Sequence, residues 1–104
     1  MNSVPINKND ILNLLRSNQT KIKTFGAKNL ALFGSYLKNE QTLTSDVDLL
    51  VEFFKEEKNY NNFINLVFYL EEILNKEVDL ITPESLSPYL KPSIINNMEY
   101  IFND

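Results

Sequence analysis

Apolar and polar residues alternate along the chain in patterns that predict both helices and strands. Helical spacing of apolar residues predicts helices over residues 7–23 and 61–75, each with one apolar face. Short apolar runs predict strands over residues 29–33, 46–54 and 77–81. The second of these strands is apolar on both faces beyond its acidic start, so we expect it to lie inside the sheet.

The remaining segments are shorter and harder to assign. Residues 34–38 predict a tight turn with room for one helical turn, and residues 39–45 predict a loop. Residues 82–84, with threonine, proline and glutamate in order, predict the start of a short helix. The apolar residues of segment 93–102 fit a helix, but residues 100–102 fit a short strand equally well. The pattern leaves both structures open.

Two aspartates open the predicted strand 46–54 and are the first candidates for chemistry. Side chains alternate between the two faces of a strand, so Asp46 and Asp48 project from the same face. Their Cα atoms would lie roughly 6.5–7 Å apart, which lets two carboxylates share one hard cation or bracket a pair of cations. The other interpretation is the solvated start of a strand, because aspartate is common in turns.

Gly34 and Ser35 follow the first predicted strand and form a second candidate site. Glycine lets the backbone turn sharply and approach a ligand closely, and Ser35 offers a hydroxyl and a backbone amide to a phosphate oxygen. Most such dipeptides are ordinary turns, so the position directly after a strand carries the argument. Lys38 either contacts a phosphate or is solvated, and Tyr36 either packs in the core or contacts a ligand.

Asp79 is a third candidate because it interrupts an otherwise apolar strand. Val78 and Leu80 face one way and Asp79 faces the other. Acids in short edge strands often do no more than prevent aggregation. The functional interpretation is that a third carboxylate completes a site for two metal ions.

The composition excludes several kinds of chemistry. The chain has no histidine and no cysteine, which excludes imidazole bases, thiolate nucleophiles, disulfides and the usual zinc sites. Any metal should then be a hard ion held by oxygen ligands, and any general base a carboxylate or, less readily, a lysine or tyrosine. The net charge of -4 argues against direct binding of nucleic acid, whose backbone normally recruits a basic stripe.

The length predicts one domain over residues 1–104, with no room for a separate substrate-binding domain. Residues 1–10 lack the basic and apolar regions of a signal peptide. No apolar stretch approaches the roughly 18 residues that span a bilayer. We therefore expect a cytoplasmic protein with no membrane partner.

The candidate residues together resemble the signature of a known family. Gly34 and Ser35 are followed, after ten residues, by Asp46-Val47-Asp48 and an apolar run, and later by Asp79 between two apolar residues. This pattern resembles the nucleotidyltransferase superfamily related to polymerase beta and, more closely, its minimal nucleotidyltransferases from prokaryotes. The resemblance implies an α/β fold, with a small mixed β-sheet and helices packed on one side.

The resemblance also implies a reaction and a role for each candidate residue. The reaction transfers a nucleoside monophosphate from a nucleoside triphosphate such as ATP to an acceptor hydroxyl. Asp46 and Asp48 would hold two Mg²⁺ ions, and Asp79 would bind the second ion and accept a proton. Gly34 and Ser35 would grip the triphosphate.

One segment departs from the pattern that family members often share. After glycine and serine they often carry a small residue, an arginine and a glycine, where this chain has Leu37, Lys38 and Asn39. Lysine keeps the positive charge of arginine but lacks its forked geometry. We expect Lys38 to contact the nucleotide, with a consequence for nucleotide affinity or choice.

The minimal branch suggests a partner protein as the acceptor. Its members are commonly encoded beside a HEPN-domain protein, and such pairs resemble toxin-antitoxin modules in which the nucleotidyltransferase is the antitoxin. By resemblance, this chain adds AMP to a tyrosine of a HEPN ribonuclease toxin, with which it could form a hetero-oligomer. Two alternatives stay open: an antitoxin or nucleotide-binding module that neutralises its partner by contact alone, and transfer to a small molecule such as an aminoglycoside.

Overall fold

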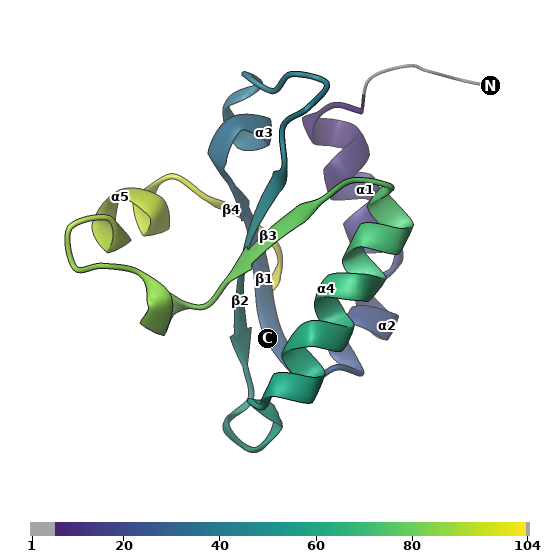
Figure 1. The fold of residues 1–104 in the computed structure, drawn as a ribbon, viewed down its shortest axis with the longest axis vertical. Coiled ribbons are helices and arrows are strands. Elements are labelled where there is room, and N and C mark those ends of the chain that lie inside the picture. The colour runs from purple at the N-terminus through teal and green to yellow at the C-terminus, as the bar shows by residue number, and fades with distance from the viewer. Residues whose placement is uncertain (1–5, 104) are drawn as a thin grey trace.

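The structure is a computed structural model that describes residues 6–103. Its centre is a four-stranded mixed sheet with the order β3-β2-β1-β4 (Figure 1). Strand β1 (Ala27–Phe33) is antiparallel to both β2 (Val47–Phe53) and β4 (Glu99–Asn103), whereas β2 is parallel to β3 (Val78–Ile81). The mixed sheet is confirmed, and the strand predicted to lie inside it, β2, does so.

Three helices cover one face of this sheet (Figure 1). They are α1 (Lys8–Ser17), α2 (Gln19–Lys23) and α4 (Tyr60–Leu74). Helix α4 matches the predicted helix 61–75 closely, and its leucines at every fourth position, Leu66, Leu70 and Leu74, are buried. No helix in the described part of the chain is both long and apolar enough to cross a membrane.

The first predicted helix, 7–23, is divided in two at Asn18. The Asn18 backbone N–H donates to the Leu15 carbonyl, one residue closer than in an α-helix, at 3.2 Å. Its side-chain amide donates to the Leu14 carbonyl at 2.8 Å, and its carbonyl oxygen accepts from the Tyr69 hydroxyl at 3.1 Å. Asparagine side chains compete for backbone groups in this way, which ends α1 before α2 begins.

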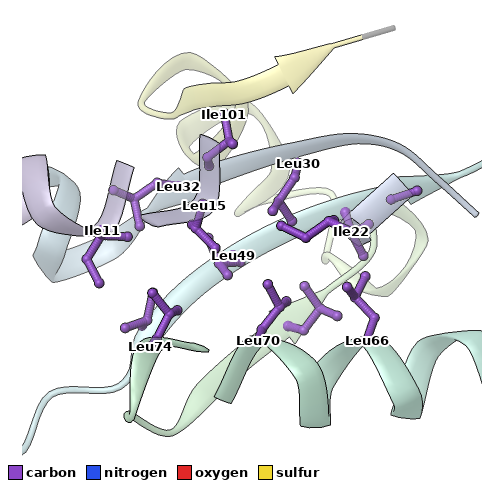
Figure 2. Packing of buried hydrophobic residues seen from close by; sticks show 14 of the residues in the cluster. Ile11, Leu15, Ile22, Leu30, Leu32, Leu49, Leu66, Leu70, Leu74 and Ile101 are labelled. Atoms are coloured by element: carbon purple, nitrogen blue, oxygen red, sulfur yellow. The ribbon is translucent and has the colours of Figure 1, made fainter. Parts of the chain in front are cut away.

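Apolar side chains from the sheet and from helices α1 and α4 fill the space between these layers (Figure 2). Burying one such side chain contributes about 1.5–3 kcal/mol relative to exposing it. The fully buried members include residues from every one of these elements: Ile11, Leu15, Leu30, Leu32, Leu49, Leu66 and Leu70. This core fixes the sheet on one face and leaves the strand ends to position the polar residues.

Segment 93–102 contains both a helix and a strand. Helix α5 (Lys91–Asn96) follows the short 3₁₀ turn η2 (Pro83–Ser85), and β4 begins at Glu99. Helix α5 buries none of its residues and lies on the opposite side of the sheet from α4 (Figure 1). Strand β4 owes its place to Ile101 and Phe102, which are buried.

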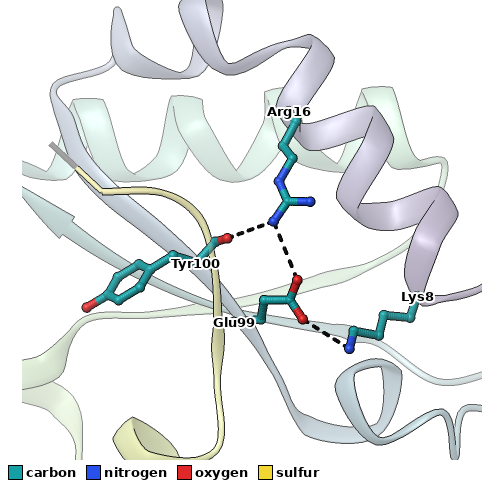
Figure 3. A network of polar contacts seen from close by, with 4 residues as sticks. All are labelled: Lys8, Arg16, Glu99 and Tyr100. Carbon is teal, nitrogen blue, oxygen red and sulfur yellow. Dashed lines mark hydrogen bonds and ion pairs between the residues drawn. The ribbon is translucent and has the colours of Figure 1, made fainter.

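A polar network ties strand β4 to helix α1 (Figure 3). The Lys8 ammonium lies 3.0 Å from the Glu99 carboxylate. The Arg16 guanidinium lies 3.5 Å from the same carboxylate and donates to the Tyr100 carbonyl at 3.1 Å. These contacts join residues near the two ends of the described chain.

Candidate active site

Strand β1 ends in a sharp turn at Gly34, which begins the short helix α3 (Gly34–Lys38). Gly34 has a φ of 78°, in the left-handed region that glycine adopts without strain. A Cβ added at Gly34 would lie 2.8 Å from the Asp48 Cγ, so a side chain here would force the Asp48 carboxylate to move. The sequence therefore needs glycine here, because the turn passes directly against the Asp48 carboxylate.

The Ser35 backbone connects this turn to strand β2. Its N–H interacts with the Asp48 carboxylate and lowers the pKa of that carboxyl. Phe33, at the end of β1, is the antiparallel partner of Asp48 in the sheet. The predicted turn and the predicted acidic strand thus meet at one point, although 13 positions separate Ser35 from Asp48 in the sequence.

The three aspartates lie at the ends of adjacent strands. Asp48 and Asp79 are paired in register on the parallel strands β2 and β3, and Asp46 immediately precedes β2. The start of β2 is held by the Val47 N–H, which donates to the Glu77 carbonyl at 2.9 Å. The side chain of Asp48 is half-buried, whereas Asp46 and Asp79 are exposed.

The surroundings of Asp48 shift the pKa of its carboxyl. Burial raises the pKa of its carboxyl, and the negative charges of Asp79 and then Asp46 raise it further, against the lowering effect of the Ser35 N–H. The two other acids are therefore close enough to repel Asp48. Within residues 6–103, however, no three acidic side chains converge into a preformed metal-binding set. The site is an open arrangement of neighbouring carboxylates.

Lys38 is the last residue of helix α3. It lines a cavity of about 280 Å³ together with Phe33, Gly34 and three residues of the α5 region, Ser93, Ile94 and Asn97. The pattern of the sequence identified Lys38 but none of the α5 residues. No spacing signal could have found them, because only the fold brings the α5 region beside Gly34.

Asn39 explains how α3 departs from the family pattern without losing its shape, and Tyr36 anchors the helix in the core. Tyr36 is 1% exposed, so of its two interpretations the core position is the correct one. Asn39 caps the helix with a φ of 61°, the left-handed conformation that glycine usually supplies at this position. Asparagine tolerates that conformation better than other residues, and the replacement of glycine is therefore structurally mild.

The arrangement suits chemistry on a phosphate ester. A backbone turn with a half-buried serine, a lysine beyond it and three oxygen-donor acids lie along one end of the sheet. All candidate ligands are oxygens, the donors that Mg²⁺ prefers. A divalent cation would also relieve the repulsion that raises the pKa of Asp48.

Fold and site together define a nucleotidyltransferase, and comparison with known proteins agrees. Residues 11–101 match the family described as nucleotidyltransferase domain, and the chain belongs to this family. A candidate protein adenylyltransferase of Methanocaldococcus jannaschii, MJ1379, is 43% identical over 97 residues, covering 88% of this chain and 95% of the relative. The protein adenylyltransferase MntA of Thermococcus cleftensis is 32% identical, covering 88% and 93%.

Solved structures show the same fold in other proteins. The structure of a candidate minimal nucleotidyltransferase superposes with a TM-score of 0.80 at 23% identity, covering 92% of this chain and 97% of the other. A toxin-antitoxin structure with AMP-PNP gives a TM-score of 0.65 at 26% identity, covering 95% and 75%. The fold recurs at 20% identity in a Shewanella oneidensis complex of a tri-AMPylated HEPN toxin with its MNT antitoxin, with a TM-score of 0.63, covering 89% and 73%.

Proposed function

We propose that this protein transfers AMP from ATP to a tyrosine hydroxyl of a HEPN ribonuclease toxin and thereby acts as its antitoxin. The observation that carries the proposal is the contact of the Gly34–Ser35 turn with Asp48, which itself pairs with Asp79. A turn that can hold phosphates thus lies against acids that can hold a cation. The protein adenylyltransferases among the relatives support AMP as the transferred group.

The roles of the residues follow from their positions. The Gly34–Ser35 turn would bind the triphosphate through backbone N–H groups and the Ser35 hydroxyl. Asp46, Asp48 and Asp79 would hold two Mg²⁺ ions, which supply charge neutralisation of the triphosphate and a more acidic acceptor hydroxyl when bound. Asp79, on the edge strand β3 and exposed, would take the proton of the acceptor hydroxyl.

The residues present fit the metal ions in chemistry and in electrostatics. Every candidate ligand is a carboxylate, and the mutual repulsion at Asp48 is the kind that a cation removes. Asp46 and Asp79 are exposed, so their side chains can rotate towards a bound ion without disturbing the core. Binding of ATP and Mg²⁺ would therefore complete a site that the fold positions only in part.

A second candidate function is neutralisation of the toxin by contact alone. The observation that favours it is the open arrangement of the acids, which do not converge into a three-acid set within residues 6–103. In this case Asp46 and Asp48 would be dispensable for neutralisation. The toxin-antitoxin structures with the same fold agree with either function.

The test is the intact mass of the HEPN toxin after incubation with this protein, ATP and Mg²⁺. We expect the mass to rise by units of AMP, and we expect no rise when Mg²⁺ is chelated or when Asp46 and Asp48 are both replaced by asparagine. The matched control is Glu72→Gln, which removes an exposed acid of helix α4 away from the site and should leave the transfer intact. A stable complex that silences the toxin with no mass increase would establish neutralisation by contact instead.

A further inference from the structure

The cavity beside Gly34 has a second wall that the nucleotidyltransferase pattern does not include. One wall comes from the end of β1 and from α3, and the other comes from the α5 region. Helix α5 lies apart from the helices that cover the sheet, and it buries none of its residues (Figure 1). Packing of the core therefore does not explain why polar residues of this region face the turn.

The strand order places the cavity relative to the three acids. The acids lie on β3 and at the start of β2, the turn follows β1, and α5 leads into β4 at the other edge. The cavity is thus on the opposite side of Gly34 from Asp79. If the α-phosphate lies at the acids, as the proposed function requires, the β- and γ-phosphates cross the turn towards the cavity.

The chemistry of the cavity suits an anion. Lys38 is its only charged lining residue, and no acid in the described part of the chain pairs with the Lys38 ammonium. The Ser93 hydroxyl is a further donor. The Asn97 amide nitrogen donates one hydrogen to the Ser93 carbonyl at 2.7 Å, which fixes the side chain and leaves its second hydrogen for a ligand.

The size of the cavity supports part of a nucleotide as its occupant. A volume of about 280 Å³ lies just below the range of about 300–1,000 Å³ that holds a drug-sized ligand. A pair of phosphate groups needs less room than a complete nucleotide. Ile94 and Phe33 complete the lining, but the donors lie on both walls.

We propose that Ser93 and Asn97, together with Lys38, bind the β- and γ-phosphates of the nucleoside triphosphate. This proposal rests on the proposed function and adds residues of the α5 region to the site. It makes α5 the wall that holds the leaving pyrophosphate while AMP is transferred. Both residues are exposed, so their replacement should leave the core intact.

The test compares the binding of ATP and of AMP, each with Mg²⁺, by titration calorimetry. The double variant Ser93→Ala/Asn97→Ala loses the proposed hydrogen bonds to the phosphates. Because hydrogen bonds to charged groups are strong, this variant should bind ATP about tenfold or more weakly. AMP lacks the two phosphates, so its affinity should change less than about twofold. Ser93→Asp, which places a negative charge in the cavity, should weaken ATP binding further. The control is Asn96→Ala, an exposed α5 residue outside the cavity lining, which should bind both nucleotides like the wild type.

The outcomes separate this proposal from the proposed function. Selective loss of ATP affinity supports the α5 site whether or not the wild-type protein transfers AMP to a toxin. Wild-type ATP affinity in both cavity variants overturns the α5 site, and AMP transfer measured in the same preparation would still stand. Equal loss of ATP and AMP affinity overturns the assignment to the β- and γ-phosphates. Absence of any ATP binding by the wild type overturns both.

Discussion

At the scale of single residues, Gly34 carries the most information about the site. Its left-handed backbone strains any other residue and its contact with Asp48 leaves no free space for a side chain, which links the turn sequence to the acid on the neighbouring strand. Sequence patterns can suggest that this glycine is needed for a turn. Only the fold shows that the space it leaves is occupied by a carboxylate.

Gly34→Ala should destabilise the protein and displace Asp48. The left-handed backbone is strained for alanine, and the added Cβ overlaps the carboxylate, so we expect a loss of about 1–3 kcal/mol in the free energy of unfolding. Urea unfolding measures this loss. The matched variant is Ser35→Ala, which keeps the backbone N–H that interacts with Asp48. It should change the free energy of unfolding by less than about 0.5 kcal/mol. It should nevertheless weaken ATP binding, because the Ser35 hydroxyl is lost. Unchanged stability of Gly34→Ala would show that the turn can move away from Asp48.

At the scale of elements, the sequence predicted strands and the long helix well. Segments 29–33, 46–54 and 61–75 correspond to β1, β2 and α4, because continuous apolar runs and helical spacing are strong signals. The break at Asn18 was missed, because the hydrogen bonds of its side chain form only in the fold, one of them from Tyr69, which is 51 positions away. The α5 wall of the cavity was missed for the same reason, because its position beside Gly34 is a property of the fold.

The network that joins α1 to β4 makes a pH-dependent prediction. Hydrogen bonding by Lys8 lowers the pKa of Glu99 below its ordinary value of 4.5. Burial opposes this effect, and the charge of Lys8 and the contacts with Arg16 lower the pKa further. The stability that the carboxylate contributes is therefore present above the ordinary pKa and is lost as the pH falls through the lowered pKa in the folded protein. The pairs are partly solvent-exposed, so Glu99→Gln should cost less than about 1 kcal/mol at neutral pH.

Urea unfolding of Glu99→Gln and wild type across the acid range measures this contribution. The difference between the two proteins should shrink as the pH falls below 4.5, because the wild-type carboxyl then loses its charge. Glu72→Gln, on the exposed face of α4, should match the wild type at every pH within about 0.5 kcal/mol. A difference that stays constant with pH would assign the effect of Glu99 to packing and not to charge.

At the scale of the whole molecule, the net charge favours a protein over a nucleic acid as the acceptor of AMP. The chain carries 14 acidic and 10 basic residues, and its candidate site holds three acids at one end of the sheet. Among residues 6–103, Lys38 is the only basic residue that lines the cavity at this site. A nucleotide can bind such a site with its own Mg²⁺ ions, but a long phosphate backbone needs a basic stripe along its path.

We therefore predict that single-stranded RNA binds this protein no more tightly than the weakest non-specific binders, with a Kd of about 10⁻⁴ M or weaker at physiological salt. Fluorescence anisotropy of a labelled oligonucleotide measures this binding, and excess RNA should leave AMP transfer to the toxin unchanged. Added positive charge near the site should raise the affinity for RNA. Replacing Glu40 and Glu77, two exposed acids flanking the site in sequence, by lysine changes the net charge from -4 to 0 and should strengthen RNA binding. Micromolar binding by the wild type that weakens steeply with salt would instead indicate a basic path formed by the fold, and would make RNA a competing acceptor for AMP.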